Sequence, residues 1–300
     1  DADIRRLPHV PGHEWVGTIV AVGRDVARWR PGARVTMPFV AGCGQCVECR
    51  EGAPQVCPAQ YQPGFSGWGS LADFVAVRYA DFNLVPAPAE LDDVAAAALG
   101  CRLATAYRAV ALQAAVQPGE WIAVHGCGGV GLSAIMVAAA RGARPIAVDV
   151  SDAALALARQ FGAEHVVNPR DAADVAEAIH ELTVRGAHVS LDALGSGTTA
   201  SNSLRSLRPR GRHVQVGLLA GADARPRLPM ELVIARELRL YGSHGLAAAD
   251  YGPLLDLAAA GAIDPRAMVQ RVISLADAPA ALAEMDQSGR TAGVTVVVPG

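Results

Sequence analysis

The sequence contains no lysine, because all 26 of its Lys and Arg residues are arginine. Lysine contacts the phosphates in P-loop ATPases, forms the Schiff base of pyridoxal enzymes, and pairs with tyrosine in short-chain dehydrogenases. This chain therefore lacks the residue on which those three classes of enzyme depend.

Long apolar runs and basic stripes are absent as well. The longest apolar stretches, around residues 94–99 and 135–140, fall well short of the roughly 20 residues that span a bilayer. The formal net charge is −3 and the charges are scattered, so no basic surface is available for a phosphate backbone. Neither a membrane nor a nucleic acid is expected as a partner.

The composition that remains is that of a globular protein with 300 residues and 51% hydrophobic content, which is enough for two domains. Residues 14–80 form an irregular β-rich region, with strands predicted at 15–22, 34–39 and 71–77. The chain opens at Asp1, ahead of any first strand or helix. We therefore expect that the beginning of the first domain is missing.

Residues 121–241 show a different rhythm, in which short β-rich runs alternate with Ala/Leu-rich helical stretches. This rhythm predicts βαβ units and a parallel sheet. Six strands are expected, the number of a dinucleotide-binding sheet: 121–125, 145–149, 165–167, 188–191, 213–217 and 238–241. A helix at 251–260, a strand at 269–273, another helix and a last strand at 294–298 should rejoin the first domain.

Four cysteines, Cys43, Cys46, Cys49 and Cys57, follow a C-x2-C-x2-C-x7-C pattern in a glycine-rich loop. Close thiolates on a chain that turns easily are typical of tetrahedral zinc. Two disulfides and an iron–sulfur cluster are the alternatives. Four protein ligands leave no open position, so this zinc would be structural.

A glycine-rich turn, GCGGVG, follows the strand predicted at 121–125 and opens an alanine-rich helix. Gly126, Gly128 and Gly131 have G-x-G-x-x-G order, with Gly129 and Val130 between them, and this context indicates a dinucleotide pyrophosphate at a helix N-terminus. Asp149 ends the next strand, where its carboxylate would bind the adenosine ribose and favour NAD over NADP. The alternative is that the glycines only permit close packing.

Two further segments complete a family pattern: PGHEWVG, with His13 and Glu14, and LGCRLATAYRAV, with Cys101. Taken singly, each is unremarkable. Together with the cysteine cluster and the glycine turn, they resemble the zinc-dependent medium-chain alcohol dehydrogenases, and the resemblance spans essentially the whole chain.

The resemblance implies an α/β fold, with a Rossmann-type doubly wound parallel sheet and an irregular β-rich, GroES-like catalytic domain. The domains would be 1–102, catalytic; 103–241, NAD-binding; and 242–300, a return to the catalytic domain. A catalytic zinc would be held by His13, Cys101 and a cysteine that this sequence lacks, with Glu14 orienting the site. Phe39 and Trp68 would face the substrate.

The same resemblance implies that nicotinamide lies near Ala193, Val216, Gly217 and Leu218, and that the cofactors are NAD, one structural zinc and one catalytic zinc. The substrate would be a small alcohol, or an aldehyde or ketone in reverse. The protein would be a cytoplasmic homodimer or homotetramer.

Three alternative functions remain at this stage. A zinc-independent quinone reductase would bind NADPH and lack the cysteines. A non-catalytic NAD- and zinc-binding regulatory protein would take one zinc, and a polyol dehydrogenase of the same superfamily would differ in substrate.

Overall fold

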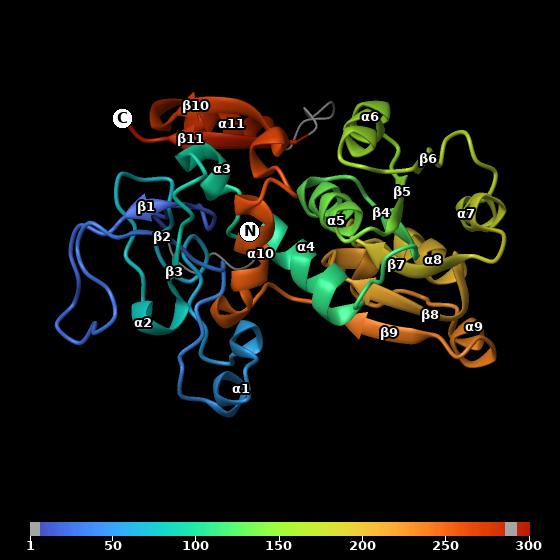
Figure 1. Ribbon diagram of the computed structural model, residues 1–300, viewed down its shortest axis with the longest axis horizontal. Coiled ribbons are helices and arrows are strands. Elements are labelled where there is room, and N and C mark those ends of the chain that lie inside the picture. The colour runs from blue at the N-terminus through green and yellow to red at the C-terminus, as the bar shows by residue number, and fades with distance from the viewer. Residues whose placement is uncertain (1–6, 286–292) are drawn as a thin grey trace. The chain divides into compact units, whose positions relative to one another are not determined.

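The computed structural model describes residues 7–285 and 293–300 (Figure 1). The chain forms two compact units: unit 1 comprises Asp1–Ala104 and Gly245–Gly300, and unit 2 comprises Thr105–His244. No helix in the described part of the chain combines the length and the apolar character that crossing a bilayer requires.

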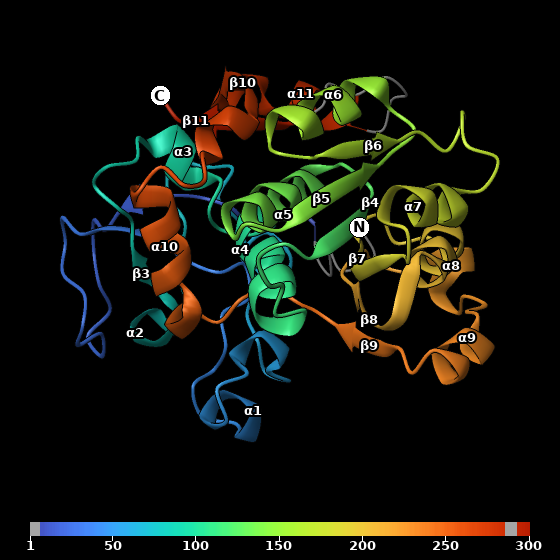
Figure 2. The ribbon, with the colours of Figure 1, turned by 45° about the vertical axis from the view of Figure 1, so that its right-hand side comes forward.

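Unit 2 is built on one parallel sheet with the strand order β6-β5-β4-β7-β8-β9, which Figure 2 shows from β6 at the top to β9 at the lower edge. The strands are β4 (Trp121–His125), β5 (Arg144–Val148), β6 (His165–Val167), β7 (Ala187–Asp192), β8 (Leu207–Gln215) and β9 (Arg239–Gly242). The chain starts in the middle of the sheet and winds outward in both directions, which is the doubly wound arrangement. All six predicted strands are present, although β8 begins at Leu207 rather than at His213.

Burial explains why the centre of this sheet reads as a continuous apolar run. All five residues of β4 are buried, as expected for a parallel strand covered on both faces. Three helices of unit 2 begin at the side-chain caps Ser151, Asp174 and Ser196, whose oxygens accept backbone N–H groups of the first turn. The helical segments are α5 (Gly129–Ala140), α6 (Asp152–Gln160), α7 (Val175–Thr183), α8 (Gly197–Arg205), α9 (Met230–Ala235), the π-helical η2 (Arg108–Gln113) and the 3-10 turn η3 (Gly221–Ala224).

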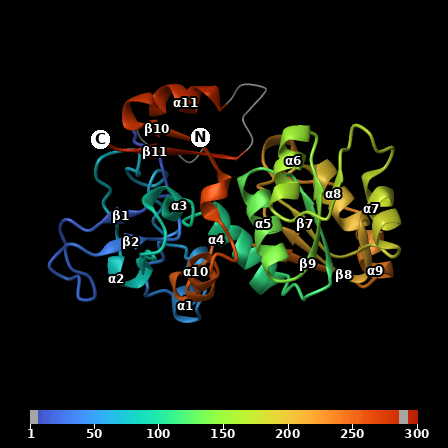
Figure 3. The same ribbon diagram turned by 45° about the horizontal axis from the view of Figure 1, so that its top comes forward.

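Unit 1 contains a three-stranded antiparallel sheet, β1 (Gly17–Thr18), β2 (Arg34–Thr36) and β3 (Val85–Pro86), and a parallel pair, β10 (Val269–Ser274) and β11 (Val294–Val298), beside α11 (Figure 3). Its apolar core is Trp15, Val35, Met37, Ala41, Tyr61 and Leu84. The α-helices are α1 (Val47–Arg50), α2 (Ala80–Asn83), α3 (Asp93–Ala97), α10 (Gly252–Ala259) and α11 (Ala278–Glu284), and α4 (Arg102–Tyr107) begins in unit 1 and ends in unit 2. The 3-10 turns are η1 (Pro54–Val56), η4 (Ala248–Asp250), η5 (Pro265–Met268) and η6 (Leu275–Asp277).

The strand predicted over residues 71–77 was wrong, and the one predicted over 15–22 is reduced to β1. Alternation of apolar and polar residues makes a segment suitable for a sheet, but a strand also needs a neighbour to share backbone hydrogen bonds. In the described residues, 71–77 has no strand beside it. The sheet instead gains β3 (Val85–Pro86), which was not predicted.

Val184, directly after α7, is the clearest case of local backbone strain in unit 2. Its φ is 66° and its ψ is −30°, a region that a β-branched residue adopts only at a cost of about 1–3 kcal/mol. The side chain is 87% exposed, so it contributes little burial in return.

We therefore expect Val184→Gly to raise the free energy of unfolding by about 0.5–1 kcal/mol, because glycine relieves more strain than its extra freedom in the unfolded chain costs. Val184→Ala should give a smaller gain. Urea titration followed by circular dichroism measures both, and a glycine variant less stable than the alanine variant would contradict the assignment of strain.

Candidate metal and cofactor sites

The four cysteines of the predicted cluster come together in unit 1, in a loop with α1 that projects from the three-stranded sheet (Figures 1 and 2). Their sulfur atoms all lie within 4.8 Å of one another. Cys49 and Cys57 are buried, whereas Cys43 and Cys46 are half-buried. All six cysteines lie in the described range and none forms a disulfide, so the disulfide alternative finds no support.

Backbone N–H groups point at the sulfurs of this cluster. The N–H of Cys43 donates to Sγ of Cys57, and the N–H of Gln45 donates to Sγ of Cys43, both at 3.4 Å. The N–H groups of Gln45 and Cys46 lower the pKa of the Cys43 thiol to about 6, whereas burial raises the pKa of Cys49. Thiolates this close repel one another, so a divalent cation is the natural counter-charge.

Asn83 anchors the start of the cysteine loop. Its side chain is buried, accepts the N–H of Gly42 at 2.8 Å and donates to the Gly42 carbonyl at 2.9 Å. A Cβ atom at Gly42 would lie 2.6 Å from Cβ of Pro54 and 3.0 Å from Sγ of Cys49. Glycine is therefore required at this position for the loop to fold around the four cysteine sulfurs.

The glycine turn of unit 2 has the geometry that a phosphate site needs. Gly126 has a φ of +93°, and a Cβ at Gly131 would overlap the carbonyl oxygen of Gly126, so both positions exclude side chains. Gly128 is the N-cap of α5 and has open space where a Cβ would point. Gly129 and Val130 begin the helix, and the N–H groups of a helix's first turn have no partner within the helix.

Asp149 lies at the end of β5, beside the turn. Its Oδ2 accepts the N–H of Cys127 at 2.7 Å and its Oδ1 accepts the N–H of Ser151 at 2.8 Å. The carboxylate thus ties the glycine turn to the start of α6, a structural role that the sequence had not suggested. Each oxygen keeps a further lone pair for another donor.

The other predicted cofactor residues lie at the carboxyl ends of β7 and β8. The N–H of Ala193 donates to the carbonyl of His125 at 2.8 Å, which joins the loop after β7 to the end of β4. Val216 and Gly217 donate backbone N–H groups to the carbonyl of Asp192, and Leu218 is exposed. All predicted cofactor residues of unit 2 therefore lie along one edge of one sheet.

Sequence reasoning missed Asp192 and Gln215, which hold the loops after β7 and β8. Asp192 is fully buried, and its Oδ1 accepts the N–H groups of Leu194 and Gly195 at 3.0 Å. Gln215 donates from Nε2 to Asp192 Oδ2 at 2.9 Å. The acid at the end of a buried strand was a signal in the sequence, but it had no motif to distinguish it.

In unit 1 the structure brings Glu14 and Cys101 together. Oε1 of Glu14 accepts the N–H groups of Cys101 and Arg102 at 2.9 and 2.8 Å, and Oε2 pairs with the Arg102 guanidinium. Glu14 therefore fixes the backbone at the start of α4, where Cys101 lies. Burial lowers the pKa of His13, so its imidazole is neutral at neutral pH and suited to a metal.

Two further residues that the sequence analysis missed support the Cys101 backbone. Arg102 supplies the charge that balances buried Glu14, and Tyr251 donates its hydroxyl to the Gly100 carbonyl at 2.9 Å. Tyr251 is buried and precedes α10. Among the described residues, however, only the four-cysteine cluster groups three or more metal ligands.

The two predicted substrate residues have different surroundings. The Phe39 ring packs edge-on to the His13 ring, with centroids 5.9 Å apart, whereas Trp68 is 67% exposed. Phe65, which was not predicted, lies closer to His13, at 5.0 Å between centroids. The aromatic wall of His13 therefore comes from Phe39 and Phe65.

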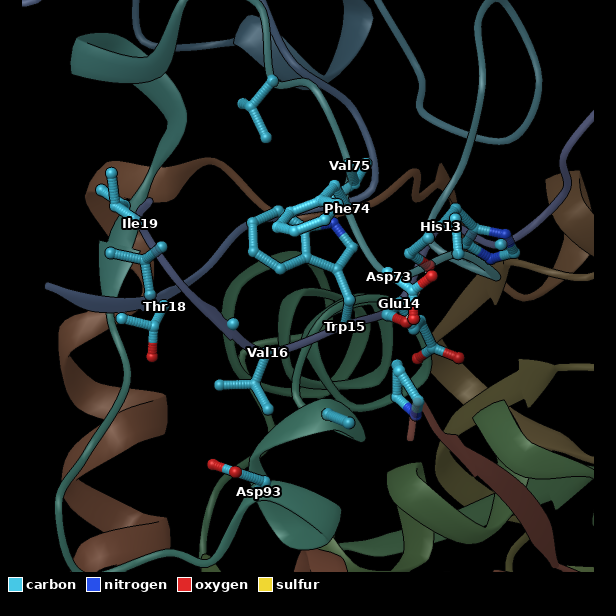
Figure 4. Close-up of a pocket in the computed structure, with 18 of the residues that line it drawn as sticks. His13, Glu14, Trp15, Val16, Thr18, Ile19, Asp73, Phe74, Val75 and Asp93 are labelled. Carbon is cyan, nitrogen blue, oxygen red and sulfur yellow. Dashed lines mark hydrogen bonds between the residues drawn. The ribbon is translucent and has the colours of Figure 1, made fainter. Parts of the chain in front are cut away.

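His13 and Glu14 also line a groove of about 740 Å³ within unit 1, which runs along residues 12–23, 70–77 and 294–299. Figure 4 shows Trp15, Phe74 and Val75 in the apolar part of the groove, with His13 and Glu14 at one end of the residues drawn. The unpaired segment 71–77 forms one of its walls.

Comparisons with known proteins give the family. Residues 1–89 match the alcohol dehydrogenase GroES-like domain, and residues 129–260 match the zinc-binding dehydrogenase domain. An alcohol dehydrogenase of Geobacillus stearothermophilus is 38% identical over 71% of this chain, and the chain spans only 62% of that relative's length. An NAD-dependent alcohol dehydrogenase of Sulfurisphaera tokodaii is 32% identical over 98% of this chain and 83% of its own length.

A solved structure agrees with these matches. A zinc-binding dehydrogenase from Sinorhizobium meliloti 1021 bound to NADP has a TM-score of 0.89 and 29% identity, covering 99% of this chain and 86% of its own. The fold class and the family predicted from the sequence are confirmed. The chain belongs to the zinc-dependent medium-chain alcohol dehydrogenases.

Proposed function

We propose that the whole protein is an NAD-dependent, zinc-containing alcohol dehydrogenase, which moves a hydride between the carbinol carbon of a small alcohol and NAD. The observation that carries this proposal is the glycine turn of unit 2. Its helix N-terminus faces open space at Gly128, while Gly131 is packed against the turn. One glycine leaves space for a ligand and the other lets the helix pack closely against the turn, and this combination suits the binding of a pyrophosphate.

Unit 2 would hold NAD through its sheet edge. The N–H groups at Gly128, Gly129 and Val130 would receive the pyrophosphate, and the spare lone pairs of Asp149 would receive the adenosine ribose. A second negative group, such as the 2′-phosphate of NADP, would be repelled by that carboxylate. The loops at Ala193 and at 216–218 would take the nicotinamide half.

The cysteine cluster would hold a structural zinc. Four sulfurs within 4.8 Å of one another fit a tetrahedral ion with Zn–S bonds of about 2.3 Å, and the N–H donors at Cys43 and Gln45 stabilise thiolates. No ligand position would remain open, so this ion would stabilise the loop rather than act on substrate.

We assign His13 and Cys101 as two ligands of a catalytic zinc, with Glu14 holding the Cys101 backbone in place. The described residues offer these two donors of the predicted set. A zinc with an open position lowers the pKa of a bound alcohol oxygen. Phe39 and Phe65 would exclude water beside the neutral His13 imidazole, while Trp68 would line the approach.

Domain roles, location and assembly are also proposals. Residues 1–102 and 242–300 would form the catalytic domain, and 103–241 the NAD-binding domain. A cytoplasmic location suits a protein whose six cysteines form no disulfide. A homodimer or homotetramer would cover the edge strand β9, where Leu240 and the nearby Ile234 of α9 are exposed.

Replacing Cys46 by Ser tests the structural zinc. The variant should lose one equivalent of zinc per chain and unfold at lower temperature, because three thiolates and a hydroxyl hold zinc less tightly. Cys127→Ser, outside the cluster, is the matched control and should keep its zinc. Metal analysis by mass spectrometry decides; unchanged zinc in the Cys46 variant would show that the cluster is not the site.

Asp149→Ala tests the choice of cofactor. The unmodified protein should bind NADH at least about tenfold more tightly than NADPH, and the variant should narrow this ratio by losing both ribose hydrogen bonds and charge repulsion. Because Asp149 also holds the glycine turn, affinity for NADH should fall as well. Fluorescence titration measures both affinities, with exposed Asp171→Asn as the control. Preference for NADPH in the unmodified protein would overturn the assignment.

Cys101→Ala tests the reaction itself. Turnover of ethanol, benzyl alcohol or a secondary alcohol should fall by roughly 100-fold or more, because the oxygen loses its charge stabilisation, while the affinity for NAD stays nearly constant. His165→Ala, in unit 2, should leave turnover intact. NAD binding with no alcohol oxidation in the unmodified protein would instead favour a non-catalytic NAD- and zinc-binding protein.

A further inference from the structure

Asp192 is the most deeply buried carboxylate in unit 2, and its hydrogen-bond partners are well defined. It ends β7, it is fully buried, and its hydrogen-bond donors are two backbone N–H groups and one amide, all uncharged. The neighbouring His213 carries no compensating charge, because burial lowers the pKa of its imidazole. Burying a carboxylate without a cation is costly, so the hydrogen bonds of Asp192 have to offset that cost.

The partners of Asp192 belong to two different loops. Its Oδ1 accepts the N–H groups of Leu194 and Gly195 in the loop after β7. Its main-chain carbonyl accepts the N–H groups of Val216 and Gly217, at 3.0 and 2.8 Å, in the loop after β8. One residue therefore binds both loops, the first by its side chain and the second by its backbone.

Gln215 completes the arrangement by linking the side chain of Asp192 to the second loop. Its Nε2 donates one hydrogen to Asp192 Oδ2 at 2.9 Å and the other to the Gly217 carbonyl at 2.8 Å. Both hydrogens of the amide are thus used. The orientation of this amide depends on the carboxylate, because an acceptor is needed at Asp192 Oδ2.

The two loops also meet backbone to backbone. Gly195 has a φ of +88°, and a Cβ there would lie 2.5 Å from the carbonyl oxygen of Leu218. A Cβ at Gly217 would overlap the backbone nitrogen of Gly195. Neither glycine can therefore be replaced by a larger residue without separating the two loops.

The position of these loops gives them a function. In a doubly wound sheet, a dinucleotide lies across the carboxyl ends of the strands, one half over each side of the point where the strand order reverses. Asp149 and the glycine turn lie on the β4–β5 side. The loops after β7 and β8 lie on the other side, where the second half of the dinucleotide is expected.

We propose that Asp192 and Gln215 are positioning residues for the nicotinamide half of NAD, a role that rests on the proposed function. Neither side chain forms a hydrogen bond to the glycine turn, although Leu194, in the loop that Asp192 holds, packs beside Gly126 of that turn. The loss of either side chain should therefore weaken ligands that span both halves of the site much more than ligands that occupy only the adenine half.

The experiment compares NAD with ADP, which lacks the nicotinamide half, by isothermal titration of the full chain. Asp192→Asn keeps the size of the side chain but places an NH2 group against the Gln215 amide, so two donors face each other. Gln215→Ala removes the amide and leaves the carboxylate in place. Each variant should bind NAD about tenfold more weakly, which corresponds to about 1.4 kcal/mol, and should bind ADP within twofold of the unmodified protein.

Asp171→Asn is the matched control, because it removes one carboxylate from the exposed surface of unit 2; it should change neither affinity. Equal losses for NAD and ADP in Gln215→Ala, or no loss for NAD in that variant, would overturn the inference. If Asp192→Asn does not fold, the result for Gln215→Ala alone tests the inference. If the unmodified protein binds ADP and NAD equally well, or binds neither, the proposed NAD site is itself wrong. That result is distinct from a failure of the positioning role of Asp192 and Gln215.

Discussion

Backbone N–H groups in loops need acceptors, and in this protein acidic and amide side chains from neighbouring elements supply them. Glu14 accepts two N–H groups at the start of α4, Asp149 accepts one from the glycine turn, and Asp192 accepts two after β7. An unsatisfied buried N–H costs about 1–3 kcal/mol. These side chains therefore decide which loop conformations persist, and Asn83 does the same for the cysteine loop.

Because of this constraint, residues that the sequence analysis connected only with ligands also hold the backbone of a loop in place. Asp149 is expected to bind a ribose, but it also closes the turn that would hold the pyrophosphate. Glu14 is expected to orient a metal site, but it also pairs with Arg102 and caps α4. Substitution of either residue therefore changes the scaffold and the chemistry together, and the two effects separate only with ligands that use part of the site.

The features predicted well are those in which local sequence determines local structure. The strands of unit 2 follow from buried apolar runs between turn residues, and the cysteine cluster and glycine turn follow from short spacings. The failures are non-local. Residues 71–77 have strand-like alternation but no neighbouring strand. Arg102 and Tyr251 act on partners that no spacing in the sequence connects with them, and the same holds for the bond between Asp192 and Gln215. His13 and Cys101 were found only through the family pattern, because 88 positions separate two ordinary residue types.

Tyr251 shows how the order of synthesis constrains unit 1. Its hydroxyl supports the Gly100 carbonyl, next to Cys101, yet all of unit 2 lies between these two positions in the chain. Domains generally fold as units while the chain emerges from the ribosome. The cysteine loop, with Asn83 only a short distance away in sequence, has all its parts early. The surroundings of Cys101 are complete only after unit 2 has been synthesised. A nascent chain would therefore form the cysteine loop first, the fold of unit 2 second and the surroundings of Cys101 last.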